Sequence, residues 1–209
     1  MNYLSPTYFF DYKHKGVQKL LIGFIDSSLS PTEKTIGLYL KIRDGIRYDP
    51  YSISLKKESL KASSIALKPK GHCVDKSILL IACLRAVGVP ARIHLAKVKN
   101  HIAIERLTEK FGTNELTPHG MVAAFLNGKW LKLSPTFNAS ICKMLQVPPL
   151  EFDGKKDSIF QQFTSDGKKF MEYLEDYGHF EDVPYDFIRN NIMEHYPKYF
   201  NSNTTEYKF

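Results

Sequence analysis

Cysteine is scarce in this sequence. The 209 residues include three, an odd number without the paired spacing of a disulfide framework. No CxxC zinc pattern is present either, so no structural metal site is expected. No apolar run approaches the length of a membrane span, and the first residues lack a basic segment followed by an apolar one. We therefore expect a reduced, cytoplasmic protein without a secretory signal and without membrane association.

Positive charge predominates, but no nucleic-acid-binding motif accompanies it. The formal net charge is +7. Part of it comes from five lysines: Lys56, Lys57, Lys61, Lys68 and Lys70. A solvated lysine-rich surface is the commoner origin of such a segment, so nucleic-acid binding is disfavoured, whereas an acidic substrate or partner is compatible with the charge. Hydrophobic residues make up 43% and charged residues 24%, which is typical of a soluble globular protein with a sizeable core.

One cysteine, Cys73, stands where a loop becomes a helix. Residues 78–87 are almost wholly apolar and stop at the sequence Gly-Val-Pro, which is a helix-ending signal. Cys73 should therefore lie in the first turn of a short buried helix. The unpaired N–H groups and the positive dipole end of such a turn favour the thiolate over the thiol. Cys83 and Cys142 are interpreted as core residues.

Two further elements are predicted before residue 100. Ser30 can cap a helix, Pro31 suits its first position, and Glu33 can complete a capping box. The sequence Arg-Tyr-Asp-Pro, which ends at Pro50, should stop that helix. Residues 91–98 alternate well enough to form a strand. A last helix is expected from about residue 182 to 196, whereas residues 99–117 and the chain past residue 135 show no clear pattern.

A β-hairpin is the most specific local prediction. Residues 121–126 and 129–133 are strand-like, and Asn127-Gly128 between them favours a two-residue turn because both positions tolerate positive φ. If Leu126 faces Lys129, side chains alternate so that one face carries an apolar set that packs on the core. The other face would carry four residues: His119, Met121, Ser134 and Thr136.

A cysteine nucleophile needs a base that shares its proton, and usually a third group that orients the base. His119 is the best of seven histidines for this role. It is expected at the rim of the hairpin, on the face away from the apolar side. It also follows, in order, a helix-starting cysteine and a strand, and it precedes a hairpin with a polar residue on the same face.

This order resembles the transglutaminase-like superfamily of papain-type cysteine enzymes. Residues 71–92, GHCVDKSILLIACLRAVGVPAR, look like the nucleophile helix of that family and the G-I-P-A-R turn after it. Residues 119–130, HGMVAAFLNGKW, look like its H-A-W-V-E-V-Y-L-N-G-K-W strand and turn, and residues 46–49, IRYD, resemble its I-x-Y-D segment. The resemblance implies an α+β fold of the cysteine-proteinase type, in which the nucleophile helix packs on an antiparallel sheet. Residues 1–209 would form one domain, with a core at 30–138 and a C-terminal extension at 139–209 packed on it.

The resemblance also implies roles for single residues. Cys73 would be the nucleophile, its backbone N–H would contribute to an oxyanion hole, and His119 would be the general base and acid. The sequence departs from the family at the third position, because residues 130–136 read WLKLSPT and Ser134 stands where the family has the Asp of D-P-T. A serine can accept the imidazole N–H and fix its tautomer, but it does not stabilise imidazolium with a full charge.

Bacterial members of the superfamily in which T-P-A-F-N replaces D-P-T resemble this variant. Residues 134–138 read SPTFN, and residues 150–158 read LEFDGKKDS, which looks like the L-E-F-D-G-x-x-D-S segment of those members. The group that orients His119 could then be Ser134, Asn138 or Asp153.

Two functions are compatible with these residues. The first is cysteine-dependent acyl transfer on protein or peptide amides, with hydrolysis by a peptidase or amidase favoured over transamidation and with no cofactor. The second is a catalytically impaired binding module of the same fold, which the missing carboxylate motivates. A metal site made from Cys73 with His72 or His119 is disfavoured, because an adjacent His and Cys do not converge easily on one tetrahedral ion.

Overall fold

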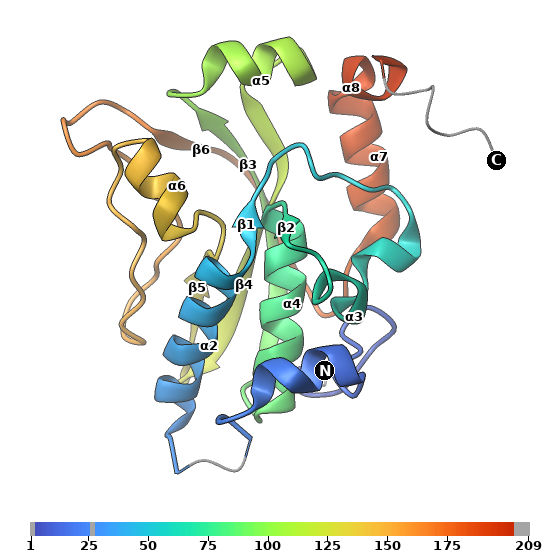
Figure 1. Cartoon of the computed structure of the whole chain (residues 1–209), viewed down its shortest axis with the longest axis vertical. Helices are drawn as coiled ribbons and strands as arrows, with labels where there is room; N and C mark the ends of the chain where they lie inside the picture. The colour runs from blue at the N-terminus through green and yellow to red at the C-terminus, as the bar shows by residue number, and fades with distance from the viewer. Residues whose placement is uncertain (1–2, 26–27, 203–209) are drawn as a thin grey trace.

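The computed structural model describes residues 3–25 and 28–202 and has an α+β fold, as expected (Figure 1). A four-stranded antiparallel sheet has the order β5 (Lys129–Leu133), β4 (Glu115–Leu126), β3 (Ala91–Asn100) and β6 (Met171–Phe180). A short parallel pair joins β1 (Arg47–Tyr48) to β2 (Lys70–Gly71). The helical elements are α1 (Lys15–Gln18), η1 (Lys19–Leu21), α2 (Pro31–Gly45), η2 (Lys57–Leu60), α3 (Ala62–Ile65), α4 (Cys73–Ala86), α5 (Ile104–Phe111), α6 (Ala139–Met144), α7 (Tyr185–His195) and α8 (Pro197–Ser202).

Helix α4 is the centre of the core. Residues 73–85 are all buried, as expected of a helix that is apolar around most of its circumference. The helix packs on β4 and against α2, and Figure 1 shows it in front of the sheet between α2 and α7. Cys83 is fully buried in it, as predicted, and the chain turns at Gly88, whose φ is +82°. None of the helices in the described ranges is long and apolar enough to cross a membrane.

The capping box at the start of α2 is confirmed. Glu33 N donates to Ser30 Oγ at 3.3 Å, and Ser30 N donates to Glu33 Oε2 at 2.8 Å. Helix α2 ends at Gly45, before the Arg-Tyr-Asp-Pro sequence. The last predicted helix is also present as α7, which ends one residue before Tyr196.

The hairpin has the predicted register. Leu126 pairs with Lys129, and the ladder continues to Val122 opposite Leu133. Asn127 and Gly128 adopt positive φ of 50° and 80°. The apolar face of the hairpin packs on the core as expected, because all five of its residues are buried: Val122, Ala124, Leu126, Leu131 and Leu133.

Two parts of the chain differ from the sequence pattern. Strand β4 begins at Glu115, well before the expected start at residue 121, because its first half pairs with β3 rather than with β5. The chain past residue 135 also contains α6 and the edge strand β6. Strand β6 reads MEYLEDYGHF, and charged side chains on an edge strand obscure the alternation that reveals an internal strand.

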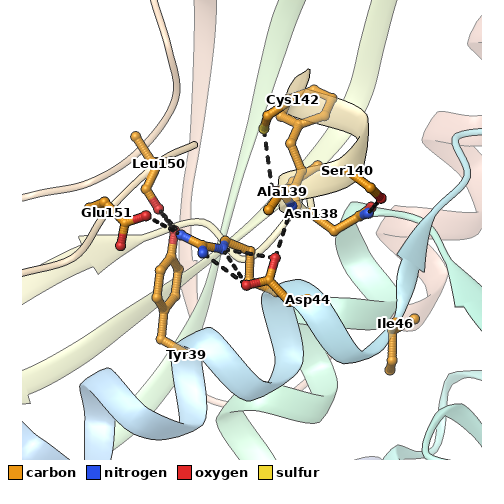
Figure 2. A network of polar contacts seen from close by, with 12 residues as sticks. Tyr39, Asp44, Ile46, Asn138, Ala139, Ser140, Cys142, Leu150 and Glu151 are labelled. Carbon is orange, nitrogen blue, oxygen red and sulfur yellow. Dashed lines mark hydrogen bonds and ion pairs between the residues drawn. The ribbon is translucent and has the colours of Figure 1, made fainter. Parts of the chain in front are cut away.

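A polar network fixes the segment after β5 to the end of α2 (Figure 2). Arg43 donates from Nη1 to the carbonyl oxygen of Leu150 and to Glu151, both at 2.9 Å, and it pairs with Asp44 at 2.8 Å. Asp44 in turn accepts from the backbone N–H of Ala139 at 2.9 Å. Residues 134–151 therefore have a fixed position against α2, and this position determines where Ser134 and Asn138 lie.

Candidate active site

Cys73 is the first residue of α4, as the sequence predicts. His72 precedes it as the N-cap in extended conformation, and His72 N donates to Asp75 Oδ2 at 3.4 Å. Gly71 belongs to β2, which pairs with β1 and so holds the segment before the helix. The thiol is thus presented where the free N–H groups of the helix converge.

Strand β4 passes very close to this first turn. A Cβ on Gly120 would lie 2.7 Å from Cα of Val74 and 3.0 Å from its nitrogen, which is a clash with backbone. Glycine is therefore needed here so that the strand can reach the helix. The sulfur of Cys73 lies 3.9 Å from the carbonyl oxygen of Pro118, and the N–H of Gly120 also acts on it. The thiol therefore contacts the peptide groups on both sides of His119.

The expected thiolate is not the resting form of Cys73. Burial raises the pKa of its thiol to about 11, although the backbone N–H groups of Gly120, Val74 and Cys73 itself act in the opposite direction. The residue is only 5% exposed. The helix N-terminus does favour the charged form, as predicted, but the loss of water around the sulfur outweighs it.

His119 lies on β4 opposite Ala96, just beyond the last hairpin pair of Val122 with Leu133, so it stands at the rim of the hairpin as expected but inside a longer strand. It is 1% exposed, because β4 continues beyond the hairpin and later segments cover that face. Neither ring nitrogen has a hydrogen-bond partner among the described residues. Burial, with a contribution from His72, lowers the pKa of His119 to about 4, so the imidazole is neutral at pH 7.

The three candidates for the orienting group make other hydrogen bonds. Ser134 Oγ pairs with Thr136 Oγ1 at 2.8 Å. Asn138 accepts from the backbone N–H of Tyr48 at 2.9 Å and donates to Ser140. Asp153 accepts from two backbone N–H groups in an exposed turn. Ser134 directly follows the end of β5 at Leu133, whose partner is Val122, so it extends from the strand beside the one that carries His119. Its orienting role stays a prediction.

A second histidine stands beside the thiol, and sequence reasoning did not single it out. His72 is buried, and its Nδ1 lies 3.1 Å from Asp75 Oδ2. Burial of Asp75 opposes its ionisation, but His72 and Lys68, which lies 3.5 Å away, more than offset this and lower its pKa. The adjacency of His, Cys and an Asp three residues after the His was the available signal. Asp75 therefore contacts both His72 and Lys68 at the start of α4.

Lys76 is another buried residue that the sequence did not mark. Its ammonium group is fully buried and donates to three carbonyl oxygens, those of Arg43 at 2.7 Å, Ile46 at 2.8 Å and Thr136 at 2.9 Å. All three of its donors are satisfied. Lys76 therefore ties the first turns of α4 to the end of α2 and to the segment that carries Ser134.

Aromatic and aliphatic side chains cover the thiol of Cys73. The cavity at Cys73 measures only about 20 Å³, enough for one water molecule. Phe111 from α5, Ile192 from α7 and Tyr196 line this cavity, and we call these three residues the roof. The Tyr196 hydroxyl donates to the carbonyl oxygen of Glu115 at 3.1 Å and accepts from the N–H of Thr117 at 2.6 Å. An acyl group reaches the thiol only if this roof moves.

Comparison with known proteins gives one family match. Residues 18–135, more than half of the chain, match the model of the transglutaminase-like superfamily. Among solved structures, one that is described as a "putative cysteine protease" from Cytophaga hutchinsonii matches with a TM-score of 0.48 and 19% identity. The match covers 64% of this chain and 40% of that chain, so this chain spans less than half of that protein. The comparison with curated proteins found no match.

Proposed function

The chain belongs to the transglutaminase-like superfamily, a family of cysteine-dependent enzymes, and from this premise we propose that it transfers acyl groups from protein or peptide amides through Cys73. The observation that carries the proposal is the placement of one thiol at the start of α4, against the peptide groups that flank His119. No other cysteine of the chain begins a helix next to a histidine.

In the proposed reaction, the sulfur of Cys73 attacks the amide carbonyl carbon while His119 accepts the thiol proton. The imidazole is neutral at pH 7, as a base must be before it acts, but with a pKa of about 4 it is a weak base until the roof opens and water reaches the ring. The backbone N–H of Cys73 stabilises the oxyanion. His119 then protonates the leaving amine, and a thioester remains on Cys73. Ser134 would fix the imidazole tautomer after a small rotation away from Thr136.

Hydrolysis is the favoured outcome for the thioester. The cavity beside the sulfur has room for about one water molecule before the roof moves, so the opening that admits an acyl group also admits water. An amine on a long side chain would need a wider opening of the roof. This difference favours a peptidase or amidase over a crosslinking enzyme.

The proposal is tested with labelled casein as a general amide substrate. Cys73→Ala and His119→Gln should each reduce hydrolysis by at least a hundredfold, whereas Cys83→Ala should retain it. Incorporation of a fluorescent alkylamine into casein measures transamidation in the same samples. Full hydrolysis by Cys73→Ala would refute the proposal.

A binding module of the same fold is the second candidate. The observations in its favour are that His119 pairs with no carboxylate in the described part of the chain and that the thiol is covered. A module predicts that Cys73→Ala has the stability and the partner affinity of the natural protein. It also predicts no covalent adduct when the protein is incubated with an activated ester, whereas the enzyme should form a thioester at Cys73.

A further inference from the structure

A cavity lies on the face of the sheet opposite α4, away from the thiol. Because Gly120 of β4 faces α4, alternation turns Ala123 to the other face, where it lines this cavity. The cavity measures about 450 Å³ and draws its walls from all four strands. Its charged and aromatic lining consists of Arg92, His94, Trp130, Lys132, Asp176, Tyr177 and His179. We call it the sheet cavity.

Basic groups outnumber acidic ones in the sheet cavity. Asp176 is its only carboxylate, and it serves two partners, His94 at 3.1 Å and Lys132 at 3.8 Å. His94 stands directly opposite His179 in the β3–β6 register. When both rings are protonated, like charges stand opposite each other, which destabilises a sheet, and a bound anion would offset that repulsion.

Arg92 carries the strongest indication of a missing partner. Its guanidinium lies 4.0 Å from the centre of the Trp130 ring, which holds it in place as a cation–π contact. Arg92 Nη1 donates to the Tyr3 hydroxyl at 3.4 Å, but no carboxylate pairs with the guanidinium in the described part of the chain, and its buried Nε has no hydrogen-bond acceptor. A buried donor of a charged group is costly to leave unpaired. Because stacking already fixes the guanidinium and no carboxylate uses its donors, Arg92 is ready to bind an oxyanion.

We propose that the sheet cavity binds a phosphate-type oxyanion, either free or as the phosphate of a monoester. Arg92 would donate to the anion, Lys132 would supply a second full charge, and His179 would complete the site when protonated. This site is separate from the proposed reaction at Cys73 and does not depend on it.

The electrostatics of the two histidines support this assignment. Burial lowers the pKa of both His94 and His179, and in both cases Arg92 and Lys132 lower it further, while Asp176 raises it. A bound anion would act in the same direction as Asp176. Protonation of His179 and anion binding therefore favour each other, and the affinity should increase as the pH falls.

The natural chain contains its own reporter, because Trp130 is its only tryptophan. Tryptophan fluorescence is followed while inorganic phosphate, phosphoserine or sulfate is added at constant ionic strength, with acetate as the monoanion control. We expect a saturable change with phosphate or phosphoserine and none with acetate. A response to phosphoserine alone identifies a monoester site, and a response to both identifies a site for the free anion. Sulfate keeps its double charge from pH 8 to pH 6, so a several-fold tighter binding of sulfate at pH 6 reports on the histidines.

Three variants and one control test the residues separately. Arg92→Gln and Lys132→Gln should each weaken binding by at least tenfold, and Lys129→Gln, on the same strand but outside the cavity, should bind normally. His179→Gln should remove the pH dependence. A linear, unsaturated response to all anions, or equal affinities in Lys132→Gln and Lys129→Gln, would overturn the proposal. Lys132 is partly exposed, so its replacement keeps the test valid if Arg92→Gln fails to fold.

Discussion

Gly120 and Val74 approach so closely that a single added methyl group at Gly120 would overlap the backbone of Val74 at 2.7 Å. This contact sets the distance between β4 and the start of α4. The same contact brings the peptide groups around His119 to the sulfur of Cys73. The geometry of the proposed site therefore depends on a residue that contributes no side chain.

Gly120→Ala should destabilise the protein by about 1–3 kcal/mol, because the strand must move away from the helix. Denaturant unfolding measures this change, and the rate of Cys73 alkylation reports the shift at the site. Gly45→Ala is the matched control, since a Cβ there meets nothing within 4 Å, and it should change stability by less than about 1 kcal/mol. Equal effects of the two substitutions would show that the contact with Val74 is loose.

Alkylation of Cys73 by iodoacetamide should rise about tenfold for each pH unit between 7 and 10. With a pKa of about 11, the thiolate fraction grows with pH throughout that range. Cys83 and Cys142 are fully buried and should react more slowly than Cys73 at every pH. Peptide mapping by mass spectrometry separates the three rates. A rate for Cys73 that is constant from pH 5 to 8 would instead indicate a thiolate–imidazolium pair.

His119 should make the fold less stable in acid. Its pKa is about 4 in the folded protein and 6.5 when unperturbed, so the unfolded chain binds a proton first as the pH falls. The free energy of unfolding should therefore decrease by about 3 kcal/mol between pH 7 and pH 4 on account of this group. In His119→Gln the decrease should be smaller by that amount. Parallel stability curves for the two proteins would show that His119 is protonated or exposed in the folded state.

Lys76→Met should lower the free energy of unfolding by about 3 kcal/mol, because three buried carbonyl oxygens lose their donor while the side-chain volume changes little. Thermal or denaturant unfolding provides the value. Lys110→Met, on the exposed side of α5, makes the same substitution where no buried carbonyl group depends on it, and it should alter stability by less than about 0.5 kcal/mol. If the two variants lost the same amount of stability, water would have to reach the three carbonyl groups in place of the lysine.

Tyr196→Ala should open the roof and raise the alkylation rate of Cys73 at pH 8 by at least tenfold, since the ring fills the space above the sulfur. Tyr196→Phe keeps the ring but leaves the buried N–H of Thr117 without its acceptor. It should therefore destabilise the fold by about 1–3 kcal/mol with little change in alkylation. If Cys73 in Tyr196→Ala reacts no faster than in the natural protein, the reagent reaches the thiol by a route that Tyr196 does not block.

Several elements were predictable because their signals lie within a few residues of each other. The Ser30–Glu33 capping box, the helix that begins at Cys73 and the Asn127-Gly128 turn each depend on neighbours along the chain. The turn fixed the register of a whole hairpin, because side chains alternate strictly along a strand. The missed strand β6 had no such local signal, since its pairing partner β3 lies about 80 residues earlier in the chain.

The sequence by itself determined that Cys73 begins a buried helix and that a histidine-bearing strand follows it. Tertiary structure alone decided the chemical state of both groups. Phe111 and Tyr196, far along the chain, close over the sulfur and remove the water that a thiolate needs. Likewise, Lys76 ties the Thr136 carbonyl to α4, and Ser134 lies in the segment thereby held in place. The charge of a site depends on solvent and on distant neighbours, which no local pattern encodes.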